Sequence, residues 1–167
     1  MTPPPPGFAQ HPRFDFFEPE DRTALVCLDV GEMQRLAVEQ LDELGYKIHT
    51  GMFLDDSLLK LRAHVYDVVI VSERFNGSTL DNHPILAEAA VSAAAQRRRQ
   101  TFVLIGASLA TNDELQAFAH NADVTLALAD IASLKPVLRR AVSRAEEFFA
   151  PLNEALARLN AALPGVR

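Results

Sequence analysis

Cysteine is nearly absent from the sequence. The single one, Cys27, lies in a stretch that we expect to form a buried strand, and it has no second cysteine for an internal disulfide bond. No cluster of cysteine and histidine has the spacing of a zinc site, and the five histidines show no ligand spacing either. We therefore expect no metal, no cofactor and a reducing compartment, the cytoplasm.

The sequence also lacks a long uninterrupted apolar run, so we expect no membrane span. Its first residues, MTPPPPGF, contain neither the basic nor the apolar region of a secretory signal. Basic residues are not in excess, since the net charge is −6 and the pI is about 5.3. A nucleic-acid-binding surface needs a basic stripe, so we expect no nucleic-acid partner. The 167 residues, 49% of them apolar, predict one domain with appendages.

Residues 1–21 form a compositional zone of their own, with six of the ten prolines and four of the ten phenylalanines. A proline run without hydrophobic periodicity predicts an extended tail, either disordered or docked. Phe14, Phe16 and Phe17 are unfavourable to leave in water. Two interpretations stay open: one or two of these rings fold back on the domain, or the segment is a short docking motif for a partner.

From Thr23 onward, strand and helix patterns alternate. Apolar or alternating stretches predict five strands, at 23–29, 46–50, 67–71, 101–106 and 123–128. Helical spacing predicts intervening helices at 32–44, at 55–65 and from 84 to the arginines at 97–99. Thr111 and Glu114 have the spacing of a capping box for the next helix.

Five such alternations, with connections long enough to be crossovers, imply an α/β fold with a five-stranded parallel sheet and helices on both faces. Right-handed crossovers favour a doubly wound, flavodoxin-like sheet of order 2-1-3-4-5. We expect the domain at residues 22–147 and a helical extension at 148–167.

Over about residues 23–147, the order and texture of the strands resemble the CheY-like receiver domain of bacterial response regulators. YDVVIV (66–71), with Gly77 at the following turn, is similar to that family's third strand and its loop, and LVCLDV (25–30) is similar to its first strand. The resemblance implies a site at the carboxyl ends of the strands. There an acidic pair holds Mg²⁺, an aspartate accepts a phosphoryl group, and a Thr or Ser and a Lys bind that group.

In this sequence those positions have lost most of that chemistry. The acidic pair falls on Asp29 and Val30, the acceptor on Ser72, the hydroxyl on Gly106 and the lysine on about Leu128. Magnesium relies on hard oxygen ligands, a serine without a base is a poor phosphoryl acceptor, and a leucine cannot pair with a phosphate. We therefore expect no conventional aspartate phosphorylation, and no enzyme activity.

Other ligand sites have weaker support. Asp29, Glu32 and Glu73 could meet at the top of the sheet, but Glu32 suits the start of a helix and Glu73 a solvated loop. A phosphate cradle needs a Gly-rich loop that runs into a helix, whereas the first strand is followed by DVGEM. The arginines at 97–99 suit the end of a helix, where positive charge is stabilising.

The last helical pattern is longer than a receiver needs, because it runs from Ser133 towards Leu163, about 45 Å at 1.5 Å per residue. Beyond Ala150 the apolar stripe has no sheet to cover, and heptad spacing predicts coiled-coil-like pairing. Pro151 is expected to kink the helix. Two outcomes stay open: this segment pairs with a second copy or a foreign partner, or it bends back as a hairpin onto its own domain.

The sequence thus predicts a non-catalytic pseudo-receiver, a protein-interaction or scaffold module of bacterial signalling or assembly. The residues expected to contact a partner are Phe14, Phe16, Phe17, Phe148, Phe149, Leu152, Leu156 and Leu159. One alternative is an atypical switch whose acceptor is Ser72 or Asp29. The other is a flavodoxin-like small-molecule sensor, which requires a concave polar pocket near Asp29, Ser72 and Gly106.

Overall fold

The computed structural model describes residues 17–163, along which strands and helices alternate. The strands are β1 (Thr23–Cys27), β2 (Lys47–Thr50), β3 (Val68–Ser72), β4 (Thr101–Gly106) and β5 (Val124–Ala127). The helices are α1 (Glu32–Glu43), α2 (Leu54–Ala63), α3 (Pro84–Val91), α4 (Ala94–Arg97), α5 (Glu114–Ala119) and α6 (Leu134–Ala162). Short 3-10 segments, Phe75–Gly77 and Leu128–Ser133, follow β3 and β5.

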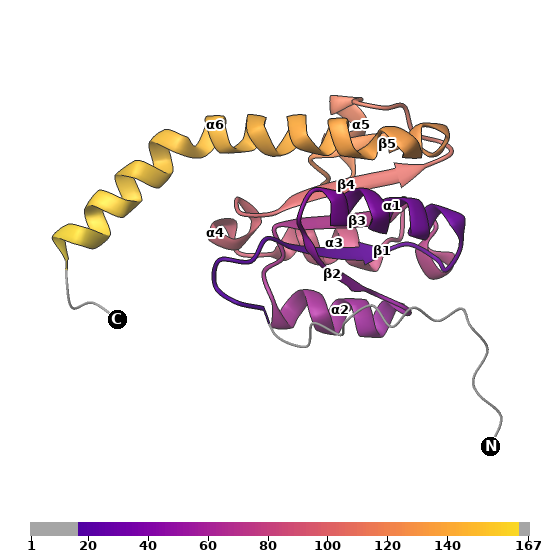
Figure 1. The fold of residues 1–167 in the computed structure, drawn as a ribbon, viewed down its shortest axis with the longest axis horizontal. Coiled ribbons are helices and arrows are strands. Elements are labelled where there is room, and N and C mark those ends of the chain that lie inside the picture. Colours follow the sequence, from indigo (N-terminus) through magenta and orange to yellow (C-terminus); the bar gives the residue numbers. More distant parts are fainter. Residues whose placement is uncertain (1–16, 164–167) are drawn as a thin grey trace, which may run out of the picture.

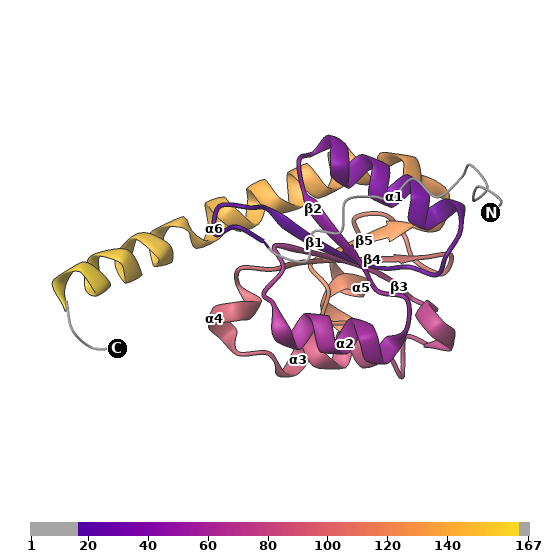
Figure 2. The same cartoon turned by 60° about the horizontal axis from the view of Figure 1, so that its bottom comes forward.

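The five strands form one parallel sheet in the order β2-β1-β3-β4-β5 (Figure 1). Figure 2 shows α1 and α6 on one side of this sheet and α2 and α3 on the other, and α5 packs with α2 and α3. The predicted doubly wound architecture is therefore confirmed.

The sheet divides the core into two layers because its strands alternate between them. In β1, Ala24 and Val26 face the layer of α1 and α6, whereas Leu25 and Cys27 face the layer of α2, α3 and α5. All residues of β1 and β4 are buried, as expected of parallel strands with helices on both faces. Among the described helices, none combines the length and apolar content that a membrane crossing requires.

Two details of the predicted helices are wrong. The helix expected from Pro84 to the arginines breaks after Val91, where Ser92 takes extended dihedral angles and donates from its hydroxyl to the Glu88 carbonyl. Serine competes for backbone bonds in this way and disfavours helix interiors. The cap of α5 is Asp113, which accepts from the Gln116 N–H at 3.0 Å. Thr111 instead donates to Asp130 across the loop.

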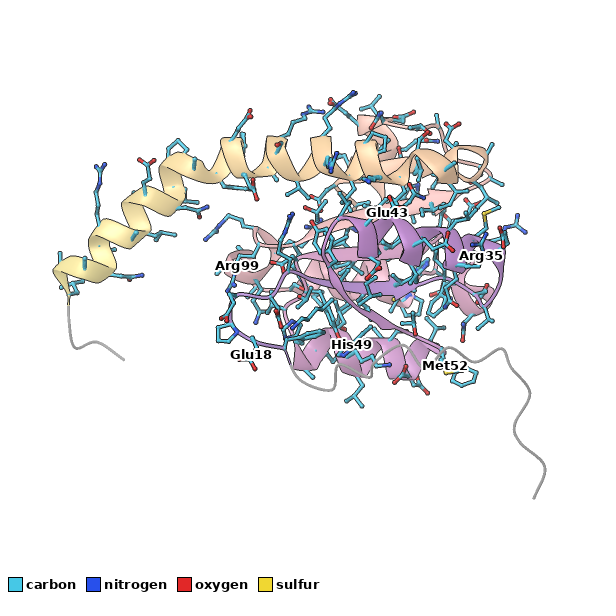
Figure 3. All side chains as sticks on the ribbon, viewed as in Figure 1. Glu18, Arg35, Glu43, His49, Met52 and Arg99 are labelled. Atoms are coloured by element: carbon cyan, nitrogen blue, oxygen red, sulfur yellow. The ribbon has the colours of Figure 1, made fainter. Side chains whose placement is uncertain are left out.

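α6 extends well beyond the domain. It is one continuous helix with Pro151 inside it, and Figure 1 shows its ribbon bending before its final turns, as the expected kink requires. Leu134 and Leu138 at its start are fully buried, whereas all residues from 151 to 163 are exposed. Figure 3 shows the side chains of these last turns standing away from the domain. The hairpin alternative is therefore wrong.

The described end of the tail folds back on the domain. The ring centroid of Phe17 lies 4.4 Å from that of His49, 4.7 Å from that of His64 and 6.0 Å from that of Tyr66. Phe17 is half-buried in this cluster, so it follows the fold-back interpretation and is not a free docking ring. Phe14 and Phe16 lie outside the described residues.

Candidate functional site

The carboxyl ends of the parallel strands bring the expected site positions to one edge of the sheet. Ser72 ends β3, Gly106 ends β4, and Leu128 follows β5 directly. Asp29 lies in the loop after β1. This edge is where ligands bind in open α/β sheets, and it is therefore the first place to look for chemistry.

Asp29 is engaged in holding the loop that follows β3. Its Oδ1 accepts from the backbone N–H and from the side-chain amide of Asn76, each at 3.1 Å. Asn76 has a φ of 49°, a left-handed conformation that asparagine tolerates better than most residues. Val30, the second position of the acidic pair, is 78% exposed. The Asp29 carboxylate thus links the loop after β1 to the loop after β3.

Glu73 is not the solvated loop residue that the sequence predicts, because it is 5% exposed. Its carboxylate accepts from the Ser108 N–H at 3.2 Å and from the Ser108 hydroxyl. A Cβ atom added to Gly106 would lie 2.6 Å from Glu73 Oε2. The Glu73 carboxylate therefore occupies the space that a side chain at position 106 would use.

Ser72 is held through its backbone and its hydroxyl. Its carbonyl accepts from His83 Nε2 at 2.8 Å, and its Oγ accepts from the Arg74 N–H at 3.3 Å. This bond assigns the Nε2–H tautomer to His83, which is 5% exposed. Burial lowers the pKa of His83, and the bond to the Ser72 carbonyl opposes that shift. His83 therefore supports the end of β3 as a neutral ring.

Asp29, Glu32 and Glu73, the three acidic residues that could have formed a metal site, do not lie together. Asp29 binds Asn76, Glu73 binds Ser108, and Glu32 pairs with Arg35 on the surface of α1. Within residues 17–163, no group of three potential ligands lies close enough to hold a metal ion. Leu128, at the position where the resemblance to receiver domains expects a lysine, packs against the core layer of α1 and α6.

A hollow of about 450 Å³ does lie at this edge, but beside the expected positions. Its lining residues are Glu73, Arg74, Gly77, Ser78, Thr79, Leu80 and Ser108. Asp29, Ser72 and Gly106 are not among them, so the pocket required by the small-molecule-sensor alternative is not found at those three positions.

Comparisons with known proteins bear on the fold. No protein-family model matches the chain, and no curated relative matches it. Among solved structures, the chemotaxis response regulator CheY4 of Vibrio cholerae superposes with a TM-score of 0.58 at 17% identity, over 72% of this chain and 98% of that one. The fold is receiver-like.

Two further structures extend the likeness. A response regulator from Hahella chejuensis gives a TM-score of 0.53 at 14% identity, over 78% of this chain and 93% of that one. A fusion that carries the trimeric coiled coil of yeast Spc42 gives 0.62 at 16% identity, over 86% of this chain and 90% of that one. At these identities the comparisons establish the receiver-like fold alone.

The expected partner residues of α6 are largely accessible on the receiver-like domain. Phe148 is 77% exposed, and the leucines at 152, 156 and 159 are 41%, 39% and 54% exposed. Phe149 is half-buried, and its ring meets that of Phe148 edge-on, with centroids 5.0 Å apart. These residues stay a predicted contact surface.

The sequence reading missed the apolar side chains of α5. Leu115 and Phe118 are 81% and 85% exposed, while Ala117 between them is buried. Phe118 and Phe148 line a cavity of about 400 Å³ between α5 and α6. The spacing of Leu115 and Phe118 could have indicated this in the sequence, because residues three apart share one helix face, and Ala117 lies on another.

The contact between Glu73 and position 106 predicts that substitutions at these two positions have non-additive effects on the free energy of unfolding. Gly106→Ala should displace the Glu73 carboxylate from Ser108 and lower the free energy of unfolding by about 1–3 kcal/mol. In a Glu73→Ala background the same substitution should have little effect, because the space is empty. Urea denaturation of the two single variants and the double variant measures this coupling. Additive effects would contradict the proposed contact.

Buried His83 and half-buried His64 predict a loss of stability in mild acid. Burial lowers the pKa of His83 and of His64 below the ordinary value of 6.5, and His49 adds to the shift at His64. The unfolded chain therefore binds more protons than the folded one between the lowered pKa and 6.5. The free energy of unfolding should fall as the pH drops through that window and stay level above it.

Urea denaturation between about pH 7.5 and pH 5 measures this dependence. His83→Gln retains a donor for the Ser72 carbonyl and should reduce the slope, and His64→Gln should reduce it further. An unchanged slope in both variants would assign the acid sensitivity to other groups.

Proposed function

We propose that this chain is a non-catalytic protein-interaction module with a receiver-like fold, which acts in bacterial signalling or assembly in the cytoplasm. No aspartate is phosphorylated in this proposal, and no metal or cofactor takes part. The observation that carries it is the buried Glu73 carboxylate, which takes the hydrogen-bond donors of Ser108 and fills the space above Gly106.

The electrostatics of the edge oppose a phosphoryl group. A phosphoryl group needs hydrogen-bond donors and positive charge around it. Here a carboxylate already uses the donors of Ser108, and its negative charge would repel a second anion nearby. Leu128 supplies no positive charge. Ser72 Oγ accepts from the Arg74 backbone amide, and among the described residues its hydroxyl donates to no base.

The outer part of α6 exposes an apolar surface. Four leucines, at 152, 156, 159 and 163, project from the part of α6 that leaves the domain. Apolar area removed from water contributes about 25 cal/mol per Å². Clustered leucines on an exposed helix are therefore better explained by a protein contact than by solvent.

Phosphorylation provides the first test. The 167-residue chain, incubated with acetyl phosphate and Mg²⁺, is expected to keep its intact mass, because the edge lacks an acceptor with a cation beside it. A conventional receiver treated in parallel shows that the donor is active. A mass increase of one phosphoryl group that is lost in Ser72→Ala or Asp29→Asn would replace this proposal by a switch with a non-standard acceptor.

Solution mass provides the second test. Light scattering should give a dimer for the 167-residue chain and a monomer for a chain that ends at Ala150, because truncation removes the exposed leucines but keeps the buried Leu134 and Leu138. Circular dichroism confirms that the shorter chain is folded. A dimer that survives truncation would move the contact to another surface.

A further inference from the structure

The apolar residues of α6 form one unbroken seam across the point where the helix leaves the domain. Its members, which alternate spacings of four and three, are Ala145, Phe149, Leu152, Leu156, Leu159 and Leu163. This is the spacing of the a and d positions of a coiled coil, with a at Phe149, Leu156 and Leu163. We call these six residues the α6 seam.

The residues that flank the outer part of the seam carry no charge. The e positions are Asn153 and Asn160, and the g positions are Ala155 and Ala162. Charged residues at e and g select a partner helix by its charge, and like charges there would repel an identical chain. The charges of this segment, Glu154 and Arg158, lie on the opposite face. The flanks therefore suit a second copy of the same helix.

The outer part of α6 is too small to hold a dimer by itself. The residues from Pro151 to Ala162 span about 18 Å of a helix about 10 Å wide, which gives a footprint of roughly 200 Å². A stable interface buries about 800 Å² on each partner. A dimer held by α6 must therefore include a second apolar surface of the domain.

The cavity between α5 and α6 offers such a surface through its two exposed rings, Phe118 and Phe148. Its other apolar lining residues are Ala117, Ala122, Val124, Val137, Ala141, Ala145 and Phe149, and its charged ones are Asp113, Glu114, Asp123, Arg140 and Arg144. It adjoins the seam at Ala145 and Phe149, which belong to both. The same two residues and Leu156 also line a second hollow, of about 410 Å³, with Arg98 and Arg99. The exposed Phe118 and Phe148 rings lie on the α5 side, so an apolar helix end that reaches Ala145 gains more contact by entering the α5–α6 groove.

We propose that two copies of the chain pair through α6 in antiparallel order, so that the end of each helix lies in the α5–α6 groove of the other copy. The register that covers the whole seam places Leu152 beside Leu156 of the second copy, and Phe149 beside its Leu159. Leu163 then reaches Ala145 of the second copy, at the mouth of the groove. This inference rests on the self-association proposed above and specifies its geometry.

Side-chain size favours this order over the parallel one. In an antiparallel pair the g positions of the two helices face each other, so the large Phe148 meets the small Ala162 of the second copy. In a parallel pair a g position faces an e position, and Phe148 would meet the amide of Asn153. The antiparallel order therefore buries the exposed Phe148 and Phe118 rings against apolar side chains.

Disulfide trapping distinguishes the two orders. A mixture of Ala145→Cys chains and Leu163→Cys chains should form cross-linked dimers under mild oxidation, whereas either variant alone should not. In the antiparallel register the two Leu163 positions lie about 27 Å apart. The native thiol does not interfere, because burial raises the pKa of Cys27 to about 12. Cross-linking of Leu163→Cys alone would establish a parallel pair and overturn the inference.

A matched pair of α5 variants tests the groove in the otherwise unaltered chain. Phe118→Asp should weaken dimerisation by about tenfold or more, as expected for a buried aromatic contact. Leu115→Asp is the control, because Leu115 is equally exposed on the same helix but does not line the groove. Equal effects of the two variants would overturn the groove contact.

The outcomes also separate this inference from the proposed function. Dimers that are lost on truncation at Ala150 but show no Ala145–Leu163 cross-link would retain self-association through α6 and reject the antiparallel groove. A 167-residue chain that stays monomeric at all concentrations would reject both the pairing and the inference. The phosphorylation test is independent of either result.

Discussion

Strands β1, β3 and β4 are buried on both faces, and this burial constrains the rest of the molecule. A strand without a solvated face must be covered on both sides, so the helices that connect the parallel strands are divided between the two faces of the sheet. The same parallel order places the carboxyl ends of the strands, and the loops that follow them, at one edge. The positions of Ser72, Gly106 and Leu128 follow from this arrangement.

At that edge, the acidic side chains of Glu73 and Asp29 form hydrogen bonds within the chain. The Glu73 carboxylate joins the end of β3 to the loop after β4 through Ser108, and Asp29 joins the loop after β1 to the loop after β3 through Asn76. Each bond satisfies a polar group that would be unfavourable to leave unpaired near the core. Hydrogen bonds between its loops thereby hold this edge of the sheet together.

In contrast to this edge, the outer part of α6 makes few contacts with the domain. The first turns of α6 share the core with α1, and their burial fixes the direction in which the helix leaves the domain. The residues after Pro151 inherit that direction and the same apolar spacing, but they meet no neighbour within residues 17–163 that buries them. The long helix therefore presents apolar side chains to solvent beyond the cavity that its earlier turns form with Phe118 of α5, which is the physical basis for the proposed pairing.

The amino-acid sequence by itself determined the element order, the sheet topology, the kinked terminal helix and the presence of Ser72 where the resemblance to receiver domains expects an aspartate. These features depend on local periodicity and on residue identity, as in the continuous apolar run of β1 or the missing N–H of Pro151. Tertiary structure alone decided the burial of Glu73, the hydrogen bond of Thr111 to Asp130 and the packing of Phe17 against His49 and His64. Each of these depends on a partner from another part of the fold, and the sequence pattern carries no information about which partner comes within hydrogen-bonding or packing distance.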